Sequence, residues 1–137
     1  RGIRKHIMQL ASQLQNDSLY IYDLELSQVR LIPDAENTWF LLIPRQENII
    51  EWIDLDLGDQ IQLTKEIDFV SRLVRDQTRP DKLNIASLGN LVPQLHIHII
   101  ARYKNDRAWP NPIWGTQSTQ SFNHNLVQKW QDLFDQS

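Results

Sequence analysis

Residues 94–100 read Gln-Leu-His-Ile-His-Ile-Ile and hold two histidines in alternate positions. In an extended strand alternate side chains share a face, so Gln94, His96 and His98 would point the same way, with neighbours roughly 7 Å apart. A phosphate group with its substituents fits between two imidazoles at that separation. Because imidazole titrates near neutral pH, one histidine can be a neutral nucleophile while the other donates a hydrogen bond. The segment therefore predicts a catalytic face that receives an anion.

Three other interpretations of the histidine pair stay open. The side chains could lie on a solvated strand face, or they could be half-buried and satisfied by backbone groups. A His-x-His pair also occurs in iron and zinc sites, which usually add a carboxylate ligand a few residues further on. Here the next acidic residue is Asp106, beyond two cationic side chains, and His6 and His124 lie in the terminal segments. We therefore predict no metal site, and a metal-dependent enzyme using His96 and His98 remains the weaker alternative.

Short β-rich runs predict the strands that must position the histidines. The expected strands are 19–22, 26–32, 38–43, 83–88 and 94–102. A turn at 33–37 makes the second and third strands an antiparallel hairpin. In the last strand the residues between the polar positions are all apolar, so that face can be covered by a helix. Trp39, at the start of the third strand, is interpreted as a core residue.

Two helices are expected beside these strands. The longer one runs from Asp59 to about Gln77 and ends before Pro80. Its apolar residues form one stripe at spacings of four, three and four: Leu63, Ile67, Val70 and Val74. A C-terminal helix is expected over 116–137, with Trp130 in the core. The predicted fold is α+β, with an antiparallel sheet of about five strands, one long helix and a C-terminal helix.

The composition is that of an ordinary globular chain and excludes several classes of function. The 137 residues fit a single domain, 1–137, with 41% hydrophobic and 23% charged residues. A net charge of −3 argues against nucleic-acid binding, which needs many cationic side chains. The absence of cysteine excludes disulfides, thiolate metal ligands and a cysteine nucleophile, and it leads us to expect a cytoplasmic protein.

The N-terminal segment, 1–17, carries no targeting signal that we recognise. No apolar run in the chain reaches the ~20 residues that a membrane-spanning helix needs, so no membrane partner is expected. The first eight residues are basic and too poor in apolar side chains for a secretion signal. Met8 is interpreted as the native start, with Arg1 to Ile7 added before it.

The histidine segment resembles a known family. The histidine-triad (HIT) superfamily carries the motif His-φ-His-φ-His-φ-φ, where φ is apolar, and residues 94–100 match it with Gln94 in place of the first histidine. Three longer stretches are similar to the bacterial branch of that family: 34–45, 82–96 and 108–115. The resemblance extends from about Ser18 to Gly115 and implies a HIT-like fold.

The resemblance implies an enzyme that cleaves nucleotide phosphoanhydrides or phosphoramidates at the α-phosphate, or transfers the nucleotidyl group. His96 occupies the position of the nucleophile, which forms a covalent nucleotidyl-histidine that water then hydrolyses. His98 matches the last histidine, which contacts the phosphate, and Gln94 matches the first, whose neighbourhood orients the nucleophile. No cofactor is implied. The implied partners are a nucleotide substrate and a second copy of the chain in a homodimer.

Further site residues follow from the same resemblance. Asn84, Gly89 and Asn90 match positions near the phosphate, where amide and backbone groups reach its oxygens. Asp34 is the nearest candidate for the residue that holds the ribose. Trp109, in the Pro- and Trp-rich loop after the last strand, is expected at the site or at the dimer interface.

The departure at Gln94 leaves a second function open. Glutamine cannot carry a proton at neutral pH, although it donates and accepts hydrogen bonds. If the first position only orients the nucleophile, activity survives the replacement. If it delivers a proton, the reaction becomes slow or restricted to good leaving groups. A non-catalytic nucleotide-binding HIT-like module is therefore the alternative to the enzyme.

Overall fold

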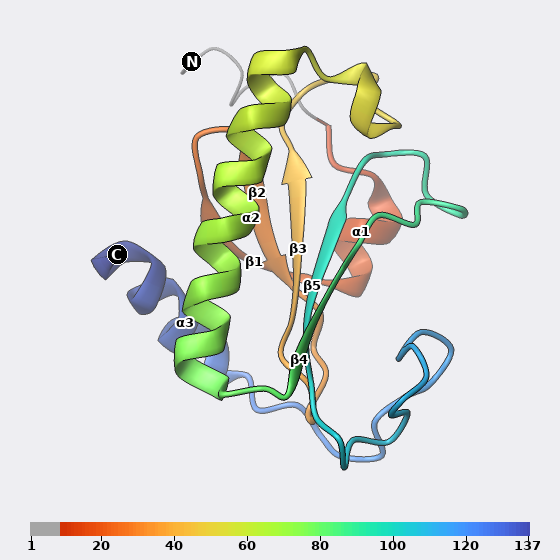
Figure 1. Ribbon diagram of the computed structural model, residues 1–137, viewed down its shortest axis with the longest axis vertical. Helices are drawn as coiled ribbons and strands as arrows, with labels where there is room; N and C mark the ends of the chain where they lie inside the picture. Colours follow the sequence, from red (N-terminus) through yellow and green to blue (C-terminus); the bar gives the residue numbers. More distant parts are fainter. Residues whose placement is uncertain (1–8) are drawn as a thin grey trace.

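Five strands form one antiparallel sheet in the computed structural model, which describes residues 9–137 (Figure 1). In the order in which they lie side by side, the strands are β1 (Leu19–Asp23), β2 (Ser27–Leu31), β3 (Trp39–Pro44), β5 (Ile97–Arg102) and β4 (Lys82–Ala86). Each neighbouring pair is antiparallel, and β2 and β3 form the predicted hairpin. The predicted α+β fold is confirmed. The interpretation of Met8 as the native start lies outside the described residues.

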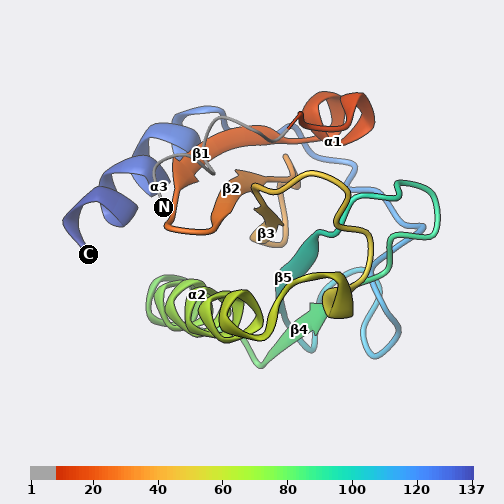
Figure 2. The same cartoon turned by 90° about the horizontal axis from the view of Figure 1, so that it is seen from above.

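The long helix α2 (Leu57–Thr78) covers one face of the sheet (Figure 2). It begins where the Asp56 carboxylate accepts a hydrogen bond from the Asp59 backbone N–H at 2.8 Å, which is a standard N-terminal cap. It ends at Arg79, whose left-handed backbone (φ 50°) breaks the helical hydrogen bonding before Pro80. Three of the four predicted stripe residues are fully buried in the main core: Leu63, Val70 and Val74.

The C-terminal helix α3 (Asn125–Gln136) covers β1 on the same side of the sheet as α2 (Figures 1 and 2). Trp130 and Phe134 are buried and meet the ring of Phe40 edge-on, at centroid distances of 4.9 and 5.7 Å. The predicted helix over 116–137 was too long at its start, because 116–124 is irregular. The Ser118 hydroxyl donates to Glu36 at 2.8 Å and helps to hold that segment against the β2–β3 loop.

Two short helices were not predicted. The 3₁₀ turn η2 (Trp52–Asp54) precedes α2, and α1 (Ser12–Asp17) lies on the sheet face opposite α2 (Figure 2). The buried Leu14 of α1 joins a second apolar cluster with Leu41, Ile43 and Val92. The helix α1 is therefore part of the fold and covers part of the second face of the sheet.

The alternation of β3 and β5 divides their side chains between the two faces. Phe40, Leu42, Ile97 and Ile99 enter the core under α2. Their neighbours in sequence point to the other face, where Leu41 lies opposite His98 and Trp39 lies opposite Ile100. A third apolar cluster on that face joins Trp39, Ile100 and Ile113. On the face opposite α2, His98 therefore lies between aromatic and aliphatic side chains.

Within residues 9–137, no helix combines the length and the hydrophobicity that crossing a lipid bilayer requires.

Candidate active site

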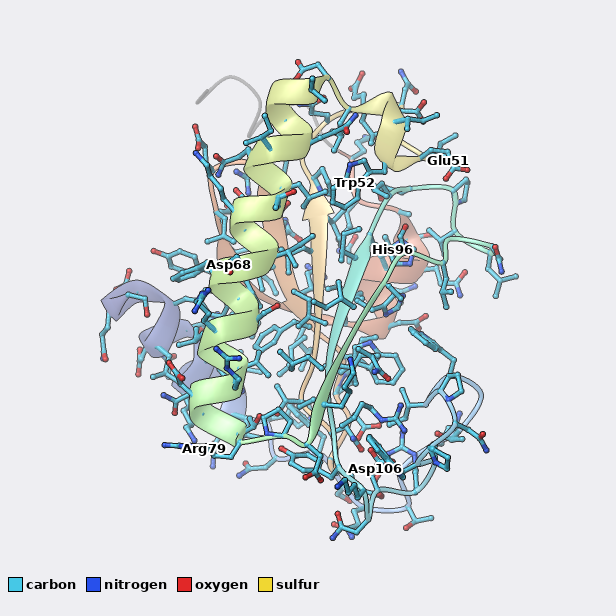
Figure 3. The ribbon with its side chains drawn as sticks, viewed as in Figure 1. Glu51, Trp52, Asp68, Arg79, His96 and Asp106 are labelled. Atoms are coloured by element: carbon cyan, nitrogen blue, oxygen red, sulfur yellow. The ribbon has the colours of Figure 1, made fainter. Side chains whose placement is uncertain are left out.

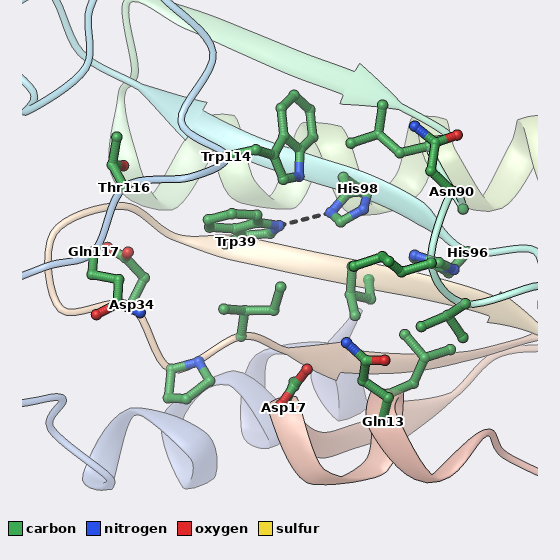
Figure 4. A pocket seen from close by; sticks show the side chains of 18 of the residues that line it. Gln13, Asp17, Asp34, Trp39, Asn90, His96, His98, Trp114, Thr116 and Gln117 are labelled. Atoms are coloured by element: carbon green, nitrogen blue, oxygen red, sulfur yellow. Dashed lines mark hydrogen bonds between the residues drawn. The ribbon is translucent and has the colours of Figure 1, made fainter.

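A pocket of about 790 Å³ opens on the sheet face opposite α2. His96 and His98 line it from β5 and the residue before it, while Gln13 and Asp17 line it from α1 (Figure 4). The remaining wall comes from the loop 88–92 between β4 and β5, the residues 32–34 after β2, Trp39 and Leu41 of β3, and the segment 114–120. Five separate parts of the chain therefore meet around the two histidines.

The backbone sets the protonation of the His96 ring. Its Nδ1 lies 2.6 Å from the carbonyl oxygen of Gln94. A carbonyl oxygen only accepts hydrogen bonds, so Nδ1 carries the proton in this contact. In the neutral ring the lone pair is then on Nε2, the atom that a nucleophilic histidine uses. The side chain is 7% exposed and lines the pocket, so the free nitrogen is held in place.

The His98 ring has the opposite arrangement. The indole N–H of Trp39 donates to its Nδ1 at 2.9 Å (Figure 4). Indole nitrogen is only a donor, so Nδ1 carries no proton and the neutral ring has its N–H at Nε2. Burial, with a smaller effect from the neighbouring His96, lowers the pKa of His98 from 6.5 to about 4. His98 is therefore a neutral hydrogen-bond donor at neutral pH.

The two rings form a complementary pair. Their centroids are 5.2 Å apart and their planes are inclined by 63°. One ring has a lone pair at Nε2, and the other has an N–H at the same atom. A group with an electrophilic centre bonded to a negatively charged oxygen, such as a phosphoryl group, matches that pair.

The loop before β5 forms one edge of the pocket. Gly89 and Asn90 both line it, and their contact with a phosphate stays a prediction. Gly89 adopts a left-handed backbone (φ 68°), a conformation that costs other residues free energy. Asn90 is exposed and its amide side chain has no protein partner among residues 9–137 (Figure 4). These residues present polar groups next to the histidines.

The structure contradicts the expectation that Gln94 shares the face of the histidines. Its side-chain oxygen accepts from the Ala11 backbone N–H at 2.8 Å, and its amide donates to the Gln9 carbonyl at 3.2 Å. The strand was predicted from residue 94, but β5 begins at Ile97. Strand alternation therefore does not reach Gln94, and its side chain binds the N-terminal segment outside the pocket.

Asn84 also lies away from the histidines. It is on β4, where its side-chain oxygen accepts a hydrogen bond from Arg102 Nη1 at 2.8 Å. The buried Arg102 in turn binds the carboxylate of Asp106, at the end of β5 opposite His96 (Figure 3). Only the side-chain oxygen of Asn84 is committed to Arg102, and Asn84 does not line the pocket, so a phosphate contact at this residue stays a prediction.

Two tryptophans line the pocket, Trp39 and Trp114, while the expectation for Trp109 at the dimer interface stays a prediction. Trp109 stacks beneath the Arg102 guanidinium, whose carbon lies 5.8 Å from the ring centroid, and it does not line the pocket. Trp114 lines it instead, with its ring edge-on to His98 at 5.2 Å. Both residues belong to one Trp- and Pro-rich loop, and the fold of that loop decides which one reaches the histidines.

Asp34 lines the pocket, but its carboxylate is already engaged. It accepts from the backbone N–H groups of Glu36 and Asn37 at 2.9 and 2.8 Å, and from Arg107 at 2.6 and 3.2 Å. Although burial opposes ionisation, these hydrogen bonds hold the pKa of Asp34 below its usual value. Asp17, at the other wall, has no protein partner among the described residues and is exposed (Figure 4).

Besides Trp114, sequence reasoning missed several residues that the structure brings to the pocket. Gln13 and Asp17 come from the unpredicted α1, and Gln117 from a segment predicted to be helical. Trp39 was interpreted as core, yet it contacts His98 directly. Trp39 lies two residues before Leu41, and Leu41 is the cross-strand partner of His98. This position could have indicated the contact only if the register of β3 on β5 had been known.

A comparison with family models identifies the fold. The model described as "HIT domain" matches residues 13–105, which is most of the chain. The chain belongs to the HIT family. Crystal structures of histidine triad proteins agree with this assignment. The protein from Bradyrhizobium japonicum is 47% identical, with a TM-score of 0.88 over 95% of this chain and 97% of that one.

Two further comparisons place this HIT protein among its relatives. A histidine triad protein from Marinobacter aquaeolei is 35% identical, with a TM-score of 0.88 over 95% of this chain and 98% of that one. A bis(5′-adenosyl)-triphosphatase of Saccharomyces cerevisiae is 30% identical over 69 residues. That match covers 47% of this chain and spans only 34% of the yeast protein.

The metal-dependent alternative finds little support in the arrangement of ligands. Within residues 9–137, no group of three or more histidine, aspartate or glutamate side chains is placed to hold a metal ion. One nitrogen of His98 is already bound by Trp39, and one nitrogen of His96 by the Gln94 carbonyl. The pair therefore offers two ligand atoms without a third.

Proposed function

We propose that this HIT protein cleaves nucleotide phosphoanhydrides or phosphoramidates at the α-phosphate, or transfers the nucleotidyl group, through a covalent nucleotidyl-His96 intermediate. The observation that carries the proposal is the complementary protonation of the two histidines: a lone pair at Nε2 of His96 beside an N–H at Nε2 of His98. Membership of the HIT family and the similarity to a yeast bis(5′-adenosyl)-triphosphatase support it.

The reaction has two displacement steps. First, the His96 lone pair forms a bond to the α-phosphorus, and the bond from phosphorus to the leaving group breaks with its electron pair on the leaving atom. Second, a water oxygen attacks the same phosphorus, the N–P bond breaks with its electron pair on Nε2, and the water protons pass to solvent. The product is a nucleoside monophosphate; another acceptor in place of water makes the reaction a transfer.

The phosphate oxygens need fixed donors while charge develops on them. His98 supplies one from Nε2, and the amide of Asn90 with the backbone N–H groups of the loop 88–92 supplies others at the pocket edge. The Gln94 side chain takes no part in these steps. Its backbone carbonyl orients His96, so the replacement of the first triad histidine leaves the nucleophile in position.

The test is a search for the intermediate with diadenosine triphosphate as the first substrate. Wild-type protein quenched during turnover should gain the mass of one adenylyl group on the peptide containing His96, and His96→Ala should lose both the adduct and the release of AMP. His124→Ala is the matched control, because His124 is exposed at the start of α3, outside the pocket. AMP release by His96→Ala at the wild-type rate would refute the assignment.

A non-catalytic nucleotide-binding module is the second candidate. It is favoured by one observation: the pocket has two histidines where the HIT motif has three. Gln94, in the first triad position, turns its side chain away from the pocket. Binding of AMP to the wild type without any adduct from a panel of anhydrides, amidates and acyl-adenylates would select this candidate.

We also propose that the protein is a cytoplasmic homodimer. The edge strand β4 has an unpaired side in the sheet order, and it carries the exposed Ile85. Exposed apolar side chains also occur around η2 and the start of α2: Ile50, Ile53, Leu57 and Ile61. Pairing of two β4 edges would cover such a strand. Light scattering of Ile85→Lys tests this, since the proposal requires a dimeric wild type and a monomeric variant.

A further inference from the structure

Trp39 reaches His98 from the neighbouring strand. Leu41 is the cross-strand partner of His98, and Trp39 lies two residues before Leu41. The rings of Trp39 and His98 are therefore diagonal neighbours on one sheet face. Both side chains are 7% exposed, and water competes little for their hydrogen bond. The register of β3 on β5 therefore directs the indole N–H at Nδ1 of His98 at 2.9 Å.

A second tryptophan closes the other side of the His98 ring. Trp114 stands edge-on to His98, with ring planes at 88° and centroids 5.2 Å apart, and edge-on to Trp39 at 6.2 Å. Its indole nitrogen is buried, lacks an acceptor, and lies at the end of the ring nearest His98 (Figure 4). Two indoles thus enclose the imidazole, and neither supplies an acceptor for a proton on Nδ1.

The charged groups around His98 do not favour a second proton on its ring. The adjacent His96 opposes a positive charge, since two imidazolium ions at this separation repel each other. The carboxylates of the pocket are Asp17 and Asp34. Asp34 is neutralised by the Arg107 guanidinium at 2.6 Å, and Asp17 lies on the far wall, in α1 (Figure 4).

We propose that Trp39 is a positioning residue that keeps His98 neutral with its proton on Nε2, so that His98 serves only as a hydrogen-bond donor to the transferred phosphoryl group. The inference deepens the function proposed above and rests on it. With the proton on Nδ1 instead, a lone pair would face the anionic phosphate and one donor would be lost. With both nitrogens protonated, Trp39 would have no acceptor. The indole contact excludes both states and assigns no proton transfer to His98.

The tautomer can be read directly in the free protein by ¹⁵N NMR with labelled histidine and tryptophan. We expect wild-type His98 to show an unprotonated Nδ1, a protonated Nε2, and a scalar coupling across the hydrogen bond to the Trp39 indole nitrogen. This pattern should persist down to about pH 5, well below the pH at which an ordinary histidine titrates. A proton on Nδ1 of His98 in the wild type would overturn the proposal without any variant.

The matched pair of variants is Trp39→Phe and Trp130→Phe. Both remove one indole from a buried position, but Trp130 packs on Phe40 under α3, away from the pocket. In Trp39→Phe we expect His98 to gain a second proton above pH 5 and kcat to fall about tenfold at pH 7, with KM changed far less. Trp130→Phe should keep the wild-type His98 spectrum and kcat.

The outcomes separate this inference from the function on which it rests. If Trp39→Phe retains both the wild-type titration of His98 and the wild-type kcat, the positioning role is wrong. If the wild type forms no adenylyl-His96, the proposed function fails, while the NMR spectrum still reports where the His98 proton lies.

Discussion

The Nδ1 atom of His96 lies 2.6 Å from the backbone oxygen of Gln94, while the Gln94 side chain points to the N-terminal segment. One residue thus orients His96, the proposed nucleophile, with its main chain and anchors the start of α1 with its amide. The position that holds the first histidine in the HIT motif therefore influences the site through its backbone, which any residue provides.

Replacing Gln94 by alanine should separate these two contributions. The backbone carbonyl remains, so the first-order rate of adenylyl-His96 formation should stay within about threefold of wild type. The two lost side-chain hydrogen bonds to Gln9 and Ala11 should lower the free energy of unfolding by about 1 kcal/mol. Rapid-quench kinetics and urea unfolding measure the two effects. A hundredfold loss of rate would mean that the amide itself takes part in the reaction.

The buried, neutral His98 should make the protein less stable in acid. Its pKa is about 4 in the folded chain, against 6.5 for an ordinary histidine, so between these values the unfolded chain binds a proton that the folded one does not. Lowering the pH through that window should therefore reduce the free energy of unfolding, by about 3 kcal/mol in total. His98→Gln, which keeps an acceptor for Trp39, should lose this part of the pH dependence. Urea titrations at both pH limits would contradict the argument if the two proteins responded equally.

The ion pair at the far end of β5 should be worth far more than an ion pair on the surface. Asp106 accepts from Arg102 at 2.9 Å and from the backbone N–H groups of Tyr103, Ala108 and Trp109. These hydrogen bonds hold the pKa of Asp106 well below its usual range, so its contribution is present at neutral pH and lost only in strong acid.

Asp106→Asn leaves the Arg102 charge buried and should cost about 3–5 kcal/mol of unfolding free energy. Asp68→Asn is the matched control, because its partner Arg72 and Asp68 itself are 65% and 59% exposed. That variant should lose less than about 1 kcal/mol. Equal losses in the two variants, measured by urea unfolding, would mean that the buried pair does not stabilise the loop.

Gly89 should resist replacement for a backbone reason. An added Cβ would meet Val92 O at 3.6 Å, an ordinary contact, but the left-handed backbone (φ 68°) strains any other residue. Gly89→Ala should lower stability by about 1 kcal/mol and reduce kcat/KM by displacing the pocket edge. Gly58→Ala, at the start of α2, should be neutral or stabilising, since alanine favours helix. Thermal unfolding and kcat/KM of the two variants provide the comparison, and an inert Gly89→Ala would show that the loop tolerates another backbone shape.

Local sequence patterns were sufficient for much of the fold. The stripe of Leu63, Val70 and Val74 predicted α2 and its buried face, because helical periodicity depends only on spacing along the chain. The hairpin of β2 and β3 followed from two β-rich runs around a short turn. The segment 116–124 was misassigned as helix; it is irregular, and its Ser118 hydroxyl donates to Glu36 of the distant β2–β3 loop.

By itself the sequence determined that two histidines of one strand segment belong to a HIT protein and share a pocket with the loop containing Gly89. Only the tertiary structure decided what surrounds them. Gln94 and Asn84 were turned to Ala11 and Arg102, and Trp39 was brought to His98. The physical reason is that side-chain direction within a strand is a local property. Hydrogen-bond partners from other strands and helices depend on register and packing, which no single segment contains.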